Sequence, residues 1–325
     1  MTRTPRHRNA RAEAQSVLGD DALEATVLEP SPPAVVSDPF ADDPTVAVSG
    51  RPAVTPTTAG AHSWDELARH RPELATFAAD HWLGAWRRLP PVPTGYAACR
   101  EALHVLAFYV ISPARRAVNQ RIGLRWTKGG FGTPFFGDDT QVRVEGTRLV
   151  VQTASGVRFD EITTLRRAGH LVDRTPNPAD RGELDAPEMP PLDAPLRVDE
   201  ATVAFLDAWF GFGPSVLEQL RVDLPHDTSL VQLWPEHFDV AVELGHEPDR
   251  RATHGFSPGD AHHPEPYVYV SAWSPVDRRN PFWNDTAFNG ASLSFADLAS
   301  AGDQRARALE FLHAGYDALS RSASR

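Results

Sequence analysis

Cysteine and lysine are nearly absent from this sequence, with one residue of each among 325. Because Cys99 stands alone, the chain has no pair for an intrachain disulfide and no thiolate set for a cysteine-based zinc site. Cys99 lies in an Ala-rich helical run, and we interpret it as a small buried hydrophobic residue rather than a nucleophile. Lys128 is the only lysine among 32 basic residues. A GC-rich genome that favours arginine codons is the simple explanation, and a role that arginine cannot fill is the alternative.

Long apolar runs and an excess of positive charge are also missing. No run approaches the roughly 20 apolar residues that a bilayer span needs, and no apolar segment typical of a secretory signal follows the N-terminal arginines. The sequence therefore predicts a cytoplasmic protein without a membrane partner. A formal net charge of -11 argues against nucleic acid as the main partner, because phosphate backbones are bound by basic surfaces. No pattern indicates an oligomeric state.

The N-terminal residues 1–60 differ from the rest of the chain. They begin with arginines, continue as an acidic stretch rich in Pro, Ala and Val, and show neither helical nor strand periodicity. We predict a disordered tail, for which a misassigned start codon is an equally simple explanation. Residues 61–325 are predicted to form a single domain.

Hydrophobic periodicity predicts both helices and strands in this domain. Helices are expected from Ser63, where Ser63 and Glu66 form a capping-box pattern, and at about 95–117, 160–172, 199–220 and 293–320. A kink or break is expected at Pro113, and an interruption at the Gly-Phe-Gly-Pro run 211–214. Strands are expected at 121–127, in QVRVEG and RLVVQT after it, and twice within 230–273. Residues 174–197 are rich in proline and acidic residues and are interpreted as a surface linker. Strands in groups between helices favour an α+β fold with a mainly antiparallel sheet flanked by helices.

The two halves of the domain, 95–173 and 198–320, resemble each other in order. Each is expected to run helix, strand, Gly/Pro loop, strand, helix, and both loops contain a Gly-Phe pair, Gly130-Phe131 and Gly255-Phe256, followed by proline and aspartate. This order suggests two pseudo-repeats, although the spacing after the shared residues differs.

The segment 230–273 holds the densest group of polar candidates. Successive side chains of a strand point to opposite faces, so His237, Asp239 and Glu243 are predicted to share one face, opposite the face of Phe238. Side chains that project in parallel from one strand face would suit two metal ligands or an acid/base pair. The alternative is that this face contacts solvent.

The loop expected after this strand adds further candidate ligands, and the hairpin should bring them back towards His237. Imidazole and carboxylate are the usual ligands of divalent transition metals when cysteine is absent, so a divalent metal is the candidate cofactor. No established metal motif is present. The predicted metal ligands are His237, Asp239, His254, His262 and His263.

The earlier loop, residues 128–139, combines close glycines, the cation Lys128 and the carboxylates Asp138 and Asp139. These are features of an anion or ligand cradle, but the phosphate-binding and dinucleotide motifs are absent, and the paired aspartates also fit a turn. Arg125 and Lys128 would be available to an anionic group of a ligand.

Two runs carry a resemblance to a family. LWPEHFDVAVELG followed by HGFSPGDAHHPEPYVYVSAW, together with GGFGTPFFGDDTQVRVEG, resembles hypothetical proteins common in high-GC Gram-positive bacteria. The resemblance covers most of 62–320. It implies one continuous domain containing both loops, and it implies no catalytic residues, because that family has no assigned activity.

These patterns support two hypotheses. In the first, a polar pocket binds a small molecule, and metal-assisted hydrolysis or general-base catalysis is the candidate chemistry. In the second, the protein is a non-catalytic binding module or partner subunit, and the polar residues brace turns or contact solvent. For the first hypothesis, the predicted catalytic residues are His237, Asp239 and Lys128. The predicted ligand-binding residues are Arg125, Glu236, Asp138, Asp260 and Tyr267, the last of which also fits a place in the core.

Overall fold

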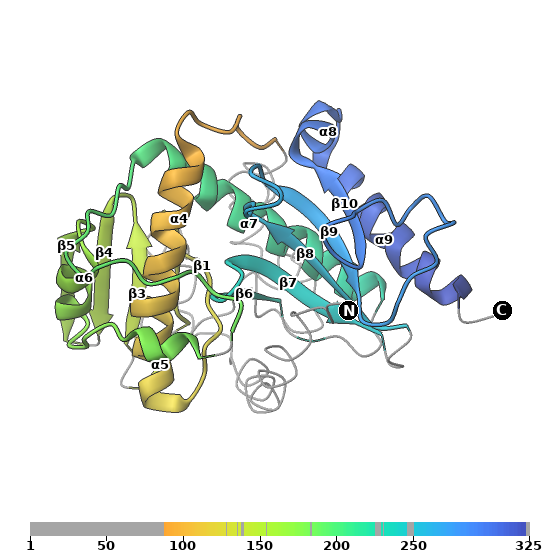
Figure 1. The fold of residues 1–325 in the computed structure, drawn as a ribbon. Helices are drawn as coiled ribbons and strands as arrows, with labels where there is room; N and C mark the ends of the chain where they lie inside the picture. Colours follow the sequence, from red (N-terminus) through yellow and green to blue (C-terminus); the bar gives the residue numbers. More distant parts are fainter. Residues whose placement is uncertain are drawn as a thin grey trace, which may run out of the picture.

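The computed structural model describes residues 88–127, 129–134, 136–137, 140–153, 155–182, 184–224, 229, 231–245 and 250–322. Within them the chain forms two five-stranded antiparallel sheets and several helices (Figure 1). The predicted α+β class is therefore confirmed. The tail expected at 1–60, the helix expected from Ser63, and the residues Lys128, Asp138 and Asp139 lie outside the described part.

The first sheet is an antiparallel meander in sequence order. Its strands are β1 (Arg125–Thr127), β2 (Gly130–Gly132), β3 (Gln141–Glu145), β4 (Arg148–Thr153) and β5 (Gly156–Glu161). Alternation places Val142 and Val144 opposite Val151 and Leu149 on one buried face. The β3–β4 turn is tight, since Glu145 pairs with Arg148 and Gly146 adopts a positive φ of 59°.

The second sheet is also a meander, and it meets the first at one point. Its strands are β6 (Gln232–Trp234), β7 (Asp239–Leu244), β8 (Ala252–Ser257), β9 (Tyr267–Ala272) and β10 (Gly290–Ser294). The backbone N–H of Leu124 donates to the carbonyl oxygen of Leu233 at 2.7 Å, and the N–H of Leu233 donates to that of Leu124 at 2.9 Å. This exchange holds the β6 edge beside the segment that enters β1.

The helices flank these sheets. They are α4 (Tyr96–Leu106), the π-helix η3 (Ala107–Ile111), α5 (Ser112–Asn119), α6 (Leu165–Leu171), the short 3₁₀ turn η4 (Pro178–Arg181), α7 (Glu200–Asp223), α8 (Phe295–Ser300) and α9 (Gln304–Ser322). The predicted helix 95–117 is present as the continuous run α4–η3–α5. Pro113 was expected to kink or end it, but the run continues through Pro113, which follows the π-helical turn η3 by two residues, where the helical hydrogen-bond pattern already changes.

Helix α7 packs against both sheets and lies behind them in the view of Figure 1. The sequence predicted an interruption at Gly211–Pro214, but the helix continues through it. The glycine at 213 has a packing reason, because a Cβ there would lie 3.1 Å from Phe256 of β8. Phe256 also contacts Trp209, while Phe210 meets Phe131 of β2. The core therefore runs without a break from one sheet to the other.

Each half runs helix, five-stranded antiparallel meander, helix, in line with the order suggested by the sequence. The shared Gly-Phe pairs, however, were predicted in loops and lie in strands. Gly130-Phe131 is in the second strand of the first sheet, and Gly255-Phe256 is in the third strand of the second. The pairs therefore do not mark equivalent positions. None of the helices in the described ranges is both long and apolar enough to cross a membrane.

Candidate functional site

Two connections that are far apart in the chain lie at the same end of the second sheet. Val240 pairs with Phe256, so the start of β7 lies beside the end of β8. The β6–β7 turn (residues 235–238) and the β8–β9 loop (residues 258–266) therefore form one border of the sheet, which we call the rim. The sequence predicted this approach of the loop towards His237.

The β6–β7 turn corrects the position of His237. One strand was expected to carry His237, Asp239 and Glu243, but β6 ends at Trp234 and β7 begins at Asp239. Proline has no N–H for a ladder hydrogen bond, and Pro235 follows β6 directly. His237 thus lies in a turn, not on the strand face of Asp239. Glu243 does share the face of Asp239, but near the other end of β7, where Arg251 pairs with it at 2.9 Å.

Phe238 anchors this turn in the core. It adopts a positive φ of 54° and is buried. Its ring is stacked on the His104 imidazole at 5.3 Å between centroids and meets Phe131 and Phe210 edge to face at 4.9 and 5.1 Å. The apolar side predicted for Phe238 is correct, and its packing brings α4, β2 and α7 to the rim.

Three polar side chains of α4 form hydrogen bonds with backbone carbonyl oxygens in both parts of the rim. The Tyr96 hydroxyl donates to the Pro258 carbonyl at 2.7 Å, and the Arg100 guanidinium donates to that of Pro264 at 3.1 Å. His104 Nε2 lies 3.0 and 3.1 Å from the carbonyl oxygens of Pro235 and Glu236. Burial lowers the pKa of His104 to about 4, so the ring is neutral and Nε2–H is the donor.

Sequence reasoning missed this role of α4, although a signal was present. Tyr96, Arg100 and His104 are spaced by four residues, which places them on one face of a helix. Polar groups repeated on one side of a largely apolar helix indicate a face with partners outside the apolar core.

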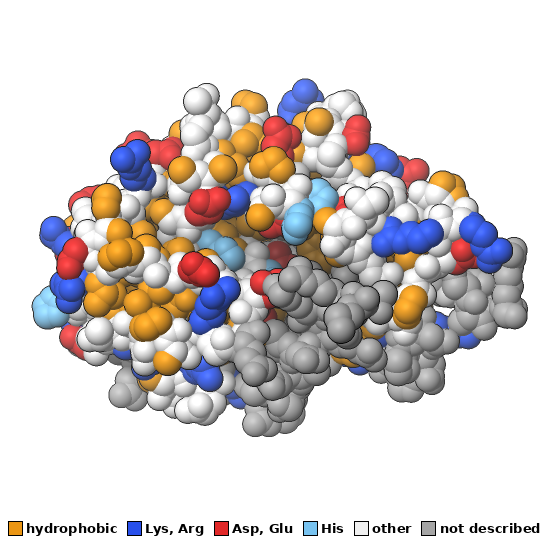
Figure 2. Space-filling model, viewed as in Figure 1, with side chains coloured by type: hydrophobic (Ala, Val, Ile, Leu, Met, Phe, Trp, Pro, Cys, Tyr) orange, Lys and Arg blue, Asp and Glu red, His pale blue; other side chains and the backbone are white. Residues whose placement is uncertain are grey.

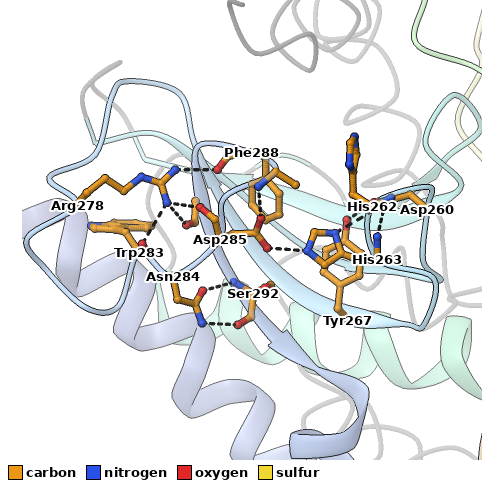
Figure 3. Close-up of polar contacts among 12 residues, drawn as sticks. Asp260, His262, His263, Tyr267, Arg278, Trp283, Asn284, Asp285, Phe288 and Ser292 are labelled. Carbon is orange, nitrogen blue, oxygen red and sulfur yellow. Dashed lines mark hydrogen bonds and ion pairs between the residues drawn. The ribbon is translucent and has the colours of Figure 1, made fainter.

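Asp260 braces the β8–β9 loop. One carboxylate oxygen accepts from the backbone N–H groups of His262 and His263 at 2.6 and 2.8 Å, and the other accepts from the Tyr267 hydroxyl at 2.7 Å (Figure 3). Burial raises the pKa of Asp260, but the hydrogen bonds from Tyr267, His263 and His262 outweigh it, and the pKa lies below its usual value. Asp260 is therefore ionised at neutral pH, and its side chain remains 42% exposed.

His263 joins this loop to the segment that precedes β10. Its Nε2 lies 3.0 Å from the buried carboxylate of Asp285, and its Nδ1 lies 3.7 Å from Asp260 (Figure 3). The ring packs on Tyr267 at 4.5 Å between centroids, and the side chain is 27% exposed. The second oxygen of Asp285 accepts from the N–H of Ala287 at 2.8 Å. No pattern in the sequence singled out Asp285, which lies 22 positions away from His263.

The segment before β10 that contains Asp285 is held in place by Arg278. Its guanidinium donates to the carbonyl oxygens of Trp283 and Phe288 at 3.1 and 2.9 Å, and also to that of Asp285. Because these bonds hold the backbone around Asp285, the carboxylate that receives His263 has a defined position. Arg100 and Arg278 thus both use their guanidinium groups on backbone carbonyls.

Aromatic rings cover the outer face of the sheet next to the rim. Tyr267 and Tyr269 lie 5.9 Å apart, Phe288 contacts both, and Trp234 belongs to the same cluster. The Tyr269 ring passes over Gly255 on β8, and its hydroxyl donates to Asp239 on β7. Tyr267 and Tyr269 are both buried. Tyr267 was interpreted either as a core residue or as a ligand-binding residue, and in both cases the environment concerned is this aromatic cluster.

His254 does not belong to the rim, contrary to prediction. It lies inside β8 rather than in a loop, and it pairs with Val242 and Val270. This register places it on the helix-covered face, opposite Asp239. The side chain is fully buried, and burial lowers its pKa to about 4. Strand parity therefore excludes a metal ion shared by His254 and Asp239.

The remaining predicted residues are also dispersed. His262 is exposed and points away from the His263–Asp285 contact (Figure 3). Arg125 is buried, donates from Nε to the Trp126 carbonyl at 3.1 Å, and lies close enough to Glu218 of α7 for its charge to act on that carboxyl. Glu236 is buried in the β6–β7 turn. Within the described ranges, no three His, Cys, Asp or Glu side chains form a group that could hold a metal ion.

The surface above these elements is hollowed. In the space-filling view a recess lies between the two halves of the molecule, with histidine and acidic side chains at its border (Figure 2).

Comparisons with protein-family models, curated proteins and solved structures found no match to this chain.

Proposed function

We propose that this protein binds a small molecule at the rim, and that the ligand carries a positive charge or several hydrogen-bond donors. The observation that carries this proposal is the carboxylate of Asp260, which is ionised, 42% exposed and held by three hydrogen bonds. A carboxylate has about four acceptor positions, so Asp260 keeps capacity for a ligand.

The charge balance of the rim supports a cationic or donor-rich ligand. Asp239, Asp260 and Asp285 lie around the aromatic cluster. The nearby cations Arg100 and Arg278 donate to backbone carbonyls. Aromatic faces also attract cations. An organic ammonium group would meet both features.

The rigidity of the rim supports binding as well. The α4 side chains and His263 join the rim to distant segments of the chain, while Asp260 and Arg278 brace the connections in which they lie. A site held in place before binding loses less conformational entropy when the ligand arrives. The resemblance to hypothetical bacterial proteins carries no activity, so the proposal depends on these residues alone.

A general-base enzyme is the second candidate, and the His263–Asp285 pair favours it. A buried carboxylate that accepts a hydrogen bond from imidazole can orient the ring and stabilise its protonated form during proton transfer. The catalytic roles predicted for His237, Asp239 and Lys128 are untested. A divalent metal also stays a prediction, for which the described residues form no ligand group. The absence of a nucleic-acid partner and the cytoplasmic location are likewise untested.

The test is a calorimetric binding panel of small amines and quaternary ammonium compounds, with carboxylates of matched size as the opposite charge. We expect the wild type to bind members of the first set, and Asp260→Asn to bind them about 10- to 100-fold more weakly, because a hydrogen bond to a charged group contributes about 1.5–3 kcal/mol. Asp317→Asn, which changes an exposed carboxylate on α9, is the matched control. Binding of the carboxylates instead, or equal affinity in Asp260→Asn, would contradict the proposal. Ester hydrolysis by the wild type that is lost in Asp285→Asn would favour the enzyme.

A further inference from the structure

The outer edge of β5 is an open strand edge. β5 ends the first sheet, and no described strand pairs with its other side. The N–H of Ile162 donates to Thr147 on the β4 side, and the two sides alternate along an antiparallel strand. The backbone groups of Val157, Phe159 and Glu161 therefore point outward. The Glu161 N–H already donates to the Asp160 carboxylate at 2.9 Å, so Val157 and Phe159 present the open groups.

The side chains next to this edge are unusually apolar for a surface. Val157 and Phe159 are 58% and 57% exposed, and they are two of the three large hydrophobic residues exposed in the described part of the chain. Their alternation places both on the same face, with the Arg148 guanidinium 5.0 Å from the Phe159 ring. Proteins usually protect open edges, because such edges recruit other strands.

The far edge of the second sheet shows such protection. The side-chain amide of Asn284 donates to the Ser292 carbonyl at 3.0 Å and accepts from the Ser292 N–H at 2.9 Å (Figure 3). One side chain thus occupies both outward backbone groups of Ser292, at the middle of β10. Among the described residues, β5 has no equivalent cover.

We propose that β5 pairs antiparallel with β5 of a second copy of this chain, about a twofold axis at Phe159. The outward direction of the Phe159 backbone makes Phe159 face its copy as a hydrogen-bonded pair, and Val157 then faces Glu161 of the partner. The result joins two five-stranded sheets into one.

Charge selects this register over its neighbours. With the axis at Phe159, Arg158 faces Asp160 of the partner on both sides of the axis, in the closely spaced, non-hydrogen-bonded positions. Shifting the axis by one residue would place Arg158 against Arg158 or Asp160 against Asp160, and like charges directly opposite are destabilising. Within the chain, Arg158 pairs with Asp173 and Asp160 pairs with Arg167. Positive and negative side chains would therefore alternate across the interface between the two β5 strands.

The strand pair alone is smaller than the roughly 1,200–2,000 Å² of a standard stable interface, so association should be weak and concentration-dependent. Sedimentation velocity of the wild type, up to about 1 mM because small interfaces are weak, should show a monomer–dimer equilibrium. Phe159→Lys should weaken dimerisation at least about tenfold, because it places two like charges opposite each other. A wild type that stays monomeric throughout would overturn the proposal.

Cysteine cross-linking tests the register, since Cys99 is buried and leaves a low background. Facing Cα atoms of a hydrogen-bonded pair lie about 5.5 Å apart, within the range of a disulfide, so Phe159→Cys should form a covalent dimer on oxidation. Val157→Cys should react at least tenfold more slowly, because the two copies would lie about 13 Å apart along the strands. Val118→Cys, at an equally exposed site on α5, is the control. Equal rates in the three variants, or no dimer from Phe159→Cys, would refute the register.

Discussion

Lowering the pH from 7 to 5 should destabilise this protein partly through one residue, His254. Its ring is fully buried in β8 between Val242 and Val270, and burial holds its pKa at about 4 against 6.5 for a hydrated imidazole. The folded protein therefore keeps the ring neutral at pH 5, while the unfolded chain binds a proton there. Stability is fully present above 6.5 and is lost as the pH falls towards 4.

The size of the effect follows from the width of this window. Each pH unit between the two pKa values corresponds to about 1.36 kcal/mol. From 6.5 to 5 the free energy of unfolding should fall by about 2 kcal/mol because of His254. His104 is also buried with a pKa of about 4, so the two histidines together should contribute about 4 kcal/mol.

The assay is urea unfolding of the wild type and His254→Leu at pH 7 and pH 5, at one ionic strength. Leucine suits the apolar neighbours, and any change in stability that is independent of pH cancels in the comparison. The loss of stability between the two pH values should be about 2 kcal/mol smaller in His254→Leu than in the wild type. His170→Leu, which removes an exposed histidine of α6, is the control substitution. If His254→Leu lost as much stability between pH 7 and pH 5 as the wild type does, the argument from burial would be refuted.

Two further substitutions probe the packing beside the rim. Gly255→Ala would place a Cβ 2.6 Å from the Tyr269 ring, and it should lower the free energy of unfolding by about 1–3 kcal/mol. Gly302→Ala, with no heavy atom within 4 Å of its Cβ, is the control; equal urea midpoints in both variants would count against the close approach. Phe238→Ala removes the ring between His104, Phe131 and Phe210 and should cost about 3–5 kcal/mol. Phe159→Ala at the exposed β5 edge serves for comparison, and a similar loss there would argue against Phe238 as the anchor of the turn.

Local patterns in the sequence were sufficient for the fold class and for several side-chain directions. Alternation in QVRVEG and RLVVQT predicted two strands that pair as β3 and β4. The apolar positions of 95–117 predicted the long helix that became α4–η3–α5. Parity correctly placed Asp239 and Glu243 together on one face of β7. These features depend only on residues close together in the sequence, so local sequence patterns are enough to predict them.

Tertiary structure decided the composition of the site, because contacts between distant segments are set by pairing register and packing. Whether His254 faces Asp239 depends on how β8 aligns with β7, and a shift of one residue would reverse its face. The contact of His263 with Asp285, and the hold of α4 on both parts of the rim, likewise join residues far apart in the chain. The sequence by itself determined which residues could carry polar chemistry in 230–273. Only the fold decided that His263 meets Asp285 at the rim while His254 is enclosed in the core.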